Sequence, residues 1–127
     1  MLECKRVLVV EDNRILRELL IDYLSISGYQ VKGLDCGAYF FKTLDDFQPH
    51  LILLDLMMPD VDGYALLEQR QQAPQWQNIP VIVLSGLAFN HQQQHALDLG
   101  ANRYLIKPTK FSTLLKAIQE EIRKYGD

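Results

Sequence analysis

Short runs of apolar residues alternate along this chain with longer segments in which apolar residues recur every three or four positions. The uninterrupted runs predict β-strands that are buried on both faces, as in a parallel sheet. The longer segments predict amphipathic helices. The predicted strands are 6–10, 30–34, 51–55, 80–84 and 103–106, and the predicted helices are 14–27, 38–44, 64–72, 89–99 and a last one that Ser112 opens as its N-cap.

Five strands that alternate with five helices predict a doubly wound α/β fold. In such a fold, right-handed crossovers place helices on both faces of one parallel sheet. The chain has 127 residues, the length of one domain, and it shows no internal repeat and no linker. We therefore expect residues 1–127 to form a single domain.

Polar residues follow the predicted strands closely. In LILLDLMMPDVDG, four aliphatic residues lead into Asp55, and turn-forming residues come soon after it. Glu11 and Asp12 follow the first strand, Ser85 the fourth and Lys107 the fifth. Open α/β sheets bind ligands outside the carboxyl ends of their strands, which all lie at one edge of a parallel sheet. We therefore expect these five side chains to converge in one crevice.

Three carboxylates in one crevice repel each other unless a cation joins them. Mg²⁺ prefers oxygen ligands of this kind, and Mn²⁺ could take the same place. One divalent ion and the Lys107 ammonium would balance the charges of Glu11, Asp12 and Asp55. Such a site could accept a phosphoryl group whose oxygens are shared by the metal, Lys107 and the Ser85 hydroxyl. Asp55 would then be the nucleophile and form an aspartyl phosphate.

The segments VLVVEDN, LILLDLMMPDVDG, PVIVLSG and GANRYLIKP closely resemble the receiver domain of response regulators in two-component signalling. The resemblance covers almost the whole chain. It implies a flavodoxin-like fold with strand order 2-1-3-4-5. It also implies that Asp55 is the phosphoacceptor and that Glu11 and Asp12 bind Mg²⁺, together with Asp55 itself and the backbone carbonyl of Met57.

The same resemblance assigns roles to residues on the last two strands. Ser85 is expected to turn its hydroxyl toward the phosphoryl group, and Lys107 to contact the phosphate. The peptide bond before Pro108 is expected to be cis. Tyr104 is expected to be the aromatic switch residue that follows the loop after the fourth strand inward.

The function expected from this resemblance is a phosphorylation-dependent switch. A sensor histidine kinase or a histidine phosphotransfer protein would present a phosphohistidine, and a downstream protein would read the change on residues 89–99, Tyr104 and the last helix. A weak homodimer could form through that surface. We expect no enzymatic activity beyond self-catalysed phosphoryl transfer and loss of the phosphate.

Two alternatives stay open at this point. A phosphatase with an aspartate nucleophile also uses Mg²⁺ on an α/β sheet, but it generally needs a second Asp two residues after the nucleophile, where this chain has Met57. A receiver-like interaction module that works without phosphate typically lacks one of the acidic residues or the lysine, and this chain has all of them.

The composition of the chain bears on its partners and its cellular location. The formal net charge of −3 argues weakly against nucleic acid or an anionic membrane as the main partner. No apolar run approaches the roughly 20 residues needed to cross a bilayer, and the N-terminus does not resemble a signal peptide. Cys4 and Cys36 form no CxxC motif and are expected to be small packing residues in a reducing cytosol. We therefore expect a cytoplasmic protein.

Several residues also have simpler interpretations. Asp12 or Asn13 could cap the first helix, and Trp76 is expected to pack partly on the surface. His91 and His95 stand one helical turn apart, but without an apparent third ligand a solvated helix face is the better interpretation than a metal site.

Two apolar residues are relevant to the lifetime of the phosphate. Met57 and Leu87 stand two residues after Asp55 and Ser85. Neither can activate an attacking water, so we expect slow loss of the phosphoryl group.

Overall fold

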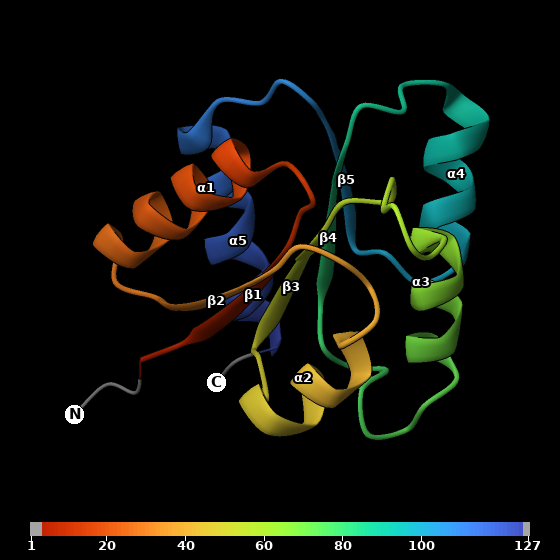
Figure 1. Ribbon diagram of the computed structural model, residues 1–127, viewed down its shortest axis with the longest axis horizontal. Helices are drawn as coiled ribbons and strands as arrows, with labels where there is room; N and C mark the ends of the chain where they lie inside the picture. The colour runs from red at the N-terminus through yellow and green to blue at the C-terminus, as the bar shows by residue number, and fades with distance from the viewer. Residues whose placement is uncertain (1–3, 126–127) are drawn as a thin grey trace.

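The computed structural model describes residues 4–125, which contain one five-stranded parallel sheet with helices on both faces (Figure 1). The strand order is β2-β1-β3-β4-β5, and every neighbouring pair is parallel, as predicted. The strands are β1 (Arg6–Val10), β2 (Gln30–Leu34), β3 (Leu51–Leu54), β4 (Val81–Ser85) and β5 (Arg103–Ile106). The helices are α1 (Arg14–Ile26), α2 (Phe40–Phe47), α3 (Gly63–Gln71), α4 (Asn90–Asp98) and α5 (Phe111–Tyr125).

Each central strand contributes to two apolar cores, one on each face of the sheet. Alternate residues of β1 and β3 pack with α1 and α5, and the residues between them pack with α2, α3 and α4. In Figure 1, α1 and α5 lie on one side of the sheet and α3 and α4 on the other. Because both faces are covered, β1, β3 and β4 need apolar residues at nearly every position, which explains the uninterrupted runs in the sequence.

β1 lies between β2 and β3, so successive strands are added first on one side of β1 and then on the other. The first crossover, through α1, therefore leads to one neighbour of β1, and the next, through α2, leads past β1 to the other. Loops diverge at such a point and leave a crevice beyond the carboxyl ends of the two strands. Glu11 follows β1 and Asp55 follows β3, so the fold places both carboxylates at this crevice.

Some predicted element bounds are wrong by a few residues. Helix α2 begins and ends later than predicted, and it stops at Gln48, whose φ of 50° is left-handed. Ser112 is not an N-cap, because the Leu114 N–H already donates to the Lys110 carbonyl and α5 begins at Phe111. Strand β3 stops one residue before Asp55, whereas β4 includes Ser85 as its last residue.

The outer face of α1 departs from the usual pattern. Leu20 and Leu24 are buried, but Ile15 and Leu19, which belong to the same apolar spacing in the sequence, are 72% and 51% exposed. Cys4 was expected to be a small packing residue, but it is exposed, and its thiol donates to the Gly28 carbonyl at 3.4 Å. None of the helices in residues 4–125 combines the length and apolarity needed to span a bilayer.

Candidate functional site

The acidic pair lies where β1 gives way to α1. The Glu11 N–H donates to the Leu34 carbonyl at 2.9 Å, which extends the sheet by one residue and leaves Glu11 only 2% exposed. Asn13 caps α1, because its Oδ1 accepts from the Leu16 N–H at 2.9 Å. The Asp12 side chain is exposed and has no hydrogen-bond or ion-pair partner in residues 4–125. Of the two candidate caps, Asn13 therefore takes the role and Asp12 remains available to a ligand.

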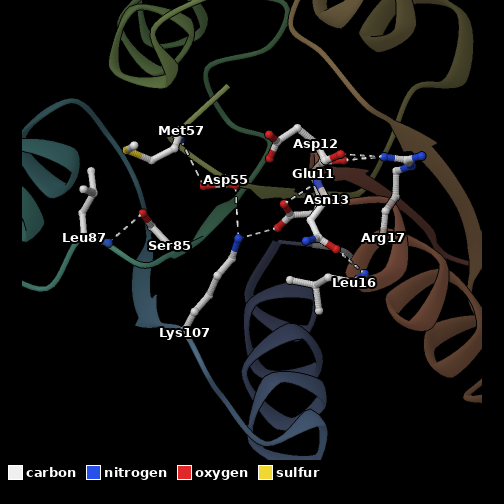
Figure 2. A network of polar contacts seen from close by, with 10 residues as sticks. All are labelled: Glu11, Asp12, Asn13, Leu16, Arg17, Asp55, Met57, Ser85, Leu87 and Lys107. Atoms are coloured by element: carbon white, nitrogen blue, oxygen red, sulfur yellow. Dashed lines mark hydrogen bonds and ion pairs between the residues drawn. The ribbon is translucent and has the colours of Figure 1, made fainter. Parts of the chain in front are cut away.

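Asp55 is held at the end of the neighbouring strand. Its N–H donates to the Val10 carbonyl at 2.9 Å, so the backbone of β1 fixes its position. Its carboxylate accepts from the Met57 N–H at 3.0 Å through Oδ1 and from Lys107 Nζ at 3.1 Å through Oδ2. The residue is 4% exposed. A nearly buried carboxylate is thus aimed into the crevice with its orientation set by two donors (Figure 2).

Lys107 joins the two carboxylate-bearing strands. Its Nζ lies 2.7 Å from Glu11 Oε1 and 3.1 Å from Asp55 Oδ2. Its own N–H donates to the Ser85 carbonyl at 2.8 Å, which anchors the end of β5 to β4. The peptide bond to Pro108 is cis, as the resemblance implied. Figure 2 shows the ammonium group between the carboxylates of Glu11 and Asp55.

Burial and the hydrogen bond between Glu11 and Lys107 have opposite effects on the pKa of each group. Burial is the largest influence on Glu11 and raises its pKa, although hydrogen bonds from Lys107 and Asn13 act in the opposite direction. Burial also disfavours the charged form of Lys107, but its hydrogen bond with Glu11 and the charges of Asp55 and Glu11 outweigh this effect and raise its pKa. The site therefore keeps a cation close to two buried carboxylates.

The site also fits a divalent cation. One carboxylate oxygen from each of Glu11, Asp12 and Asp55 lies within 4.8 Å of the others. Three ionised carboxylates and one ammonium leave a formal excess of two negative charges. Oxygen ligands with this excess suit Mg²⁺, and the exposed Asp12 makes the site open to solvent.

The loop between β3 and α3 is shaped by its own contacts. Met57 forms an isolated antiparallel bridge with Asp62, and Asp62 also caps α3 by accepting from the Tyr64 N–H at 3.0 Å. A Cβ at Gly63 would lie 2.5 Å from the Leu56 Cα, so only glycine allows this close approach. Asp62 is thus one of the turn-forming residues that the sequence indicated after Asp55. Asp60 instead accepts from the distant Gly37 N–H at 2.9 Å.

Ser85 and Tyr104 both hold Leu87, in the loop that follows β4. The Ser85 Oγ accepts from the Leu87 N–H at 3.2 Å, and the Tyr104 hydroxyl donates to the Leu87 carbonyl at 2.7 Å. In residues 4–125, no hydrogen bond joins the Ser85 hydroxyl to Asp55 or Lys107. Ser85 thus lies beside the carboxylate cluster but is engaged with the loop, and Leu87 connects it to Tyr104.

Sequence reasoning missed Arg17, whose Nη1 donates to the Glu11 carbonyl at 2.9 Å and lies 3.4 Å from the Asp12 carbonyl. This contact holds the backbone of the acidic pair from the first turns of α1. An arginine seven residues after a strand end is a weak signal, because many helices carry one there.

The two histidines of α4 have aromatic partners. His95 stacks on the Tyr64 ring at 4.4 Å, and the Tyr64 hydroxyl donates to the Gln92 carbonyl at 3.2 Å. His91 stacks on Phe89 at 5.9 Å. Among the described residues, no group of three potential metal ligands includes either histidine. Both histidines are exposed, so they lie on a solvated face of α4 as expected, and each stacks on one aromatic ring.

Comparison with known proteins gives a consistent result. Residues 7–119 match the family model of the response regulator receiver domain. The chain is 34% identical over 120 residues to the transcriptional regulatory protein GltR of Pseudomonas aeruginosa, and 35% identical over 119 residues to the response regulator RR06 of Streptococcus pneumoniae. Each match covers 94% of this chain but only 50% and 54% of the relative, so the chain spans about half the length of these proteins.

A solved structure shows the same fold. It is the signal receiver domain of a signal transduction histidine kinase from Syntrophus aciditrophicus, with 30% identity and a TM-score of 0.89. The alignment covers 97% of this chain and 93% of that one. The likeness therefore extends over the whole sheet and its helices.

Proposed function

This chain belongs to the response regulator receiver domain family, and on that premise we propose that Asp55 is its phosphoacceptor. Receiver domains of this family act as phosphorylation switches in two-component signalling. The observation that supports Asp55 most strongly is its position. It is a nearly buried carboxylate at a strand end, hydrogen-bonded to a lysine and within 4.8 Å of two further carboxylates.

The transfer proposed here exchanges one bond to phosphorus for another. A carboxylate oxygen of Asp55 attacks the phosphorus of a phosphohistidine, the P–N bond breaks, and its electron pair leaves with the imidazole nitrogen. Lys107, already 3.1 Å from Oδ2, would offset the charge that the phosphoryl group brings.

Glu11, Asp12, Asp55 and the Met57 carbonyl would hold Mg²⁺, or Mn²⁺ in its place, and the ion would neutralise phosphoryl oxygens. This assignment fits the donor chemistry of the cluster, since every proposed ligand is an oxygen.

The switch would start at Ser85. Once Asp55 carries the phosphoryl group, the Ser85 hydroxyl turns to donate to one of its oxygens and no longer holds the Leu87 N–H. The loop after β4 then shifts, and the Tyr104 hydroxyl loses the Leu87 carbonyl that it contacts at 2.7 Å. Tyr104 and α4 change position, and a downstream protein reads the surface of α4, β5 and α5. A weak homodimer could use the same surface.

The phosphodonor is proposed to dock on α1. Ile15 and Leu19 are exposed there, and Leu19 and Pro108 line an apolar cavity of about 280 Å³ that also reaches Lys107. Apolar surface beside a charged reaction site suits a protein partner that must place a phosphohistidine near Asp55. A sensor histidine kinase or a histidine phosphotransfer protein has this chemistry.

We further propose that residues 1–127 act as one domain and that the protein acts in the cytoplasm.

No observation favours the two alternatives. A phosphatase would need an acid near the leaving group, and the side chain two residues after Asp55 is the apolar, exposed Met57. We therefore propose that the protein is not an enzyme toward external substrates. A phosphate-independent module would have no use for the ion-paired Lys107 and the open Asp12, both of which this site keeps.

Labelling with a small phosphodonor such as acetyl phosphate tests the proposal. Wild-type protein should gain an acid-stable, base-labile phosphate in the presence of Mg²⁺, and Asp55→Asn should gain none. Asp60→Asn is a matched control, because Asp60 follows the same strand but contacts Gly37 instead of Lys107. Equal labelling of wild type and Asp55→Asn would contradict the proposal.

A further inference from the structure

Two adjoining cavities lie at the amino-terminal edge of the sheet, opposite to Asp55. Their volumes are about 250 and 240 Å³, and Pro49, Gln75 and Ile79 line both of them, so that they form one groove. We call it the amino-edge groove. Its walls are the α2–β3 loop and the α3–β4 loop, in the lower part of Figure 1. Pro49 and Ile79 precede β3 and β4, whereas Asp55 and Ser85 come at their far ends, so the length of the sheet separates the groove from the phosphoacceptor.

The lining of the groove combines apolar and aromatic side chains with polar ones such as Gln48 and Asn78. Pro49, Pro74, Ile79 and the Trp76 indole contribute to it, and the Gln75 amide lies among them. Trp76 is half-buried, and its ring packs against Phe41 of α2 at 5.1 Å. This contact fixes the indole in the wall of the groove. A fixed indole among prolines is a surface on which a rigid, extended peptide can pack.

One end of the groove carries a carboxylate that has no partner among the residues that the structure describes. Asp45 lines the first cavity, and it has no ion pair or hydrogen bond within the described part of the chain. It is the only charged side chain among the described residues that line this cavity. Its neighbour Asp46 differs, because it pairs with Lys42 Nζ at 2.7 Å and does not line the groove. The groove therefore offers a single unbalanced negative charge beside an aromatic and proline surface.

We propose that the amino-edge groove binds an extended segment of a partner protein in which a Lys or Arg lies next to prolines. A polyproline II segment packs its rings on an indole at low cost in entropy, and its solvated carbonyls can accept from the Gln75 amide. Asp45 then selects a segment with a cation at one end. This interaction uses no phosphoryl group, so it adds a second binding surface to the phosphorylation switch.

The chain contains one tryptophan, so fluorescence reports directly on the groove. The probe is the peptide acetyl-Arg-Pro-Leu-Pro-Pro-Leu-Pro-amide, and the comparison peptide has Glu in place of Arg. The full chain should show a saturable change in Trp76 emission with the Arg peptide, and binding of the Glu peptide should be about threefold weaker or more, as expected for an exposed ion pair. Asp45→Asn should remove most of this difference, and the matched control Asp46→Asn should retain it.

Three outcomes would overturn the proposal. They are no saturable change with the Arg peptide, equal binding of both peptides to the wild type, and Trp76 emission that depends on protein concentration alone, which would indicate that a second copy occupies the groove. Added NaCl should weaken the Arg peptide more than the Glu peptide, and this test needs no variant. Asp55→Asn should bind the Arg peptide as the wild type does, so failure here and failure of the phosphoacceptor proposal are distinguishable.

Discussion

At the carboxyl edge of the sheet, the buried Glu11 and Asp55 share the Lys107 ammonium, whereas at the amino edge the buried Arg70 guanidinium donates, within residues 4–125, to backbone carbonyls alone. Arg70 donates to the Gln77 carbonyl at 2.7 Å and to the Gly100 carbonyl at 2.9 Å, and it is 2% exposed. Its Nε has no partner in the described chain, and burial lowers its pKa.

The two edges therefore use buried charge for different purposes. Gln77 and Gly100 belong to the loops that precede β4 and β5, so Arg70 ties these loops to α3. The carboxylates at the other edge instead leave an excess of charge that a cation can satisfy. Charge that is bonded internally thus stabilises the fold, whereas charge that stays partly unbalanced is available for chemistry.

The largest effect is expected for Arg70→Ala at the amino edge. The substitution removes two hydrogen bonds to backbone carbonyls and leaves a cavity where the buried side chain lay, and it should lower the free energy of unfolding by about 2–4 kcal/mol. Urea denaturation measures this change. Glu68→Ala, at an exposed position on the same helix, should have little effect. At temperatures where Arg70→Ala is folded, its labelling by acetyl phosphate should match that of the wild type. If the folded variant cannot accept phosphate, the two edges of the sheet do not have separate roles.

Asp12→Asn, at the carboxyl edge, is expected to weaken Mg²⁺ binding without destabilising the fold. It removes one of three clustered carboxylates, so Mg²⁺ affinity measured by calorimetry should fall at least about tenfold. Stability should stay the same or rise slightly, because one like charge is lost. Asp35→Asn controls for net charge, since Asp35 follows β2 at the same edge but lies outside the cluster. A clear loss of stability in Asp12→Asn would contradict this division between the edges.

The fold and the acidic cluster could be predicted because both depend on where strands end. Apolar runs located the strand ends to within a residue or two, and parallel pairing brings those ends together whatever the side chains do. Arg17, Arg70 and Asp60 could not be predicted in the same way. Each acts through contacts with backbone atoms of another segment, and such contacts depend on the packed positions of several elements. The choice of Asn13 over Asp12 as the cap is likewise decided by local conformation.

A smaller effect is expected for the lifetime of the phosphate. Met57 and Leu87 are apolar, and we predict that neither orients water toward a phosphoryl group on Asp55. The double variant Met57→Asn, Leu87→Glu adds an amide and a carboxylate that can, so its phosphate should be lost about threefold to tenfold faster. The measurement is the decay of labelled protein after the phosphodonor is removed. If the wild type loses its phosphate faster than the variant, this part of the account is wrong.

The central claim is that the carboxyl edge reacts and moves while the amino edge stays fixed. Amide NMR spectra recorded before and after phosphorylation with acetyl phosphate and Mg²⁺ test it most directly. We expect shifts for the signals of Asp55, Ser85, Leu87, Tyr104 and Lys107, and nearly unchanged signals for Gln77 and Gly100, which Arg70 holds. Shifts confined to Asp55, with Leu87 and Tyr104 unmoved, would contradict the switch, and equal shifts at Gln77 and Gly100 would contradict the fixed edge.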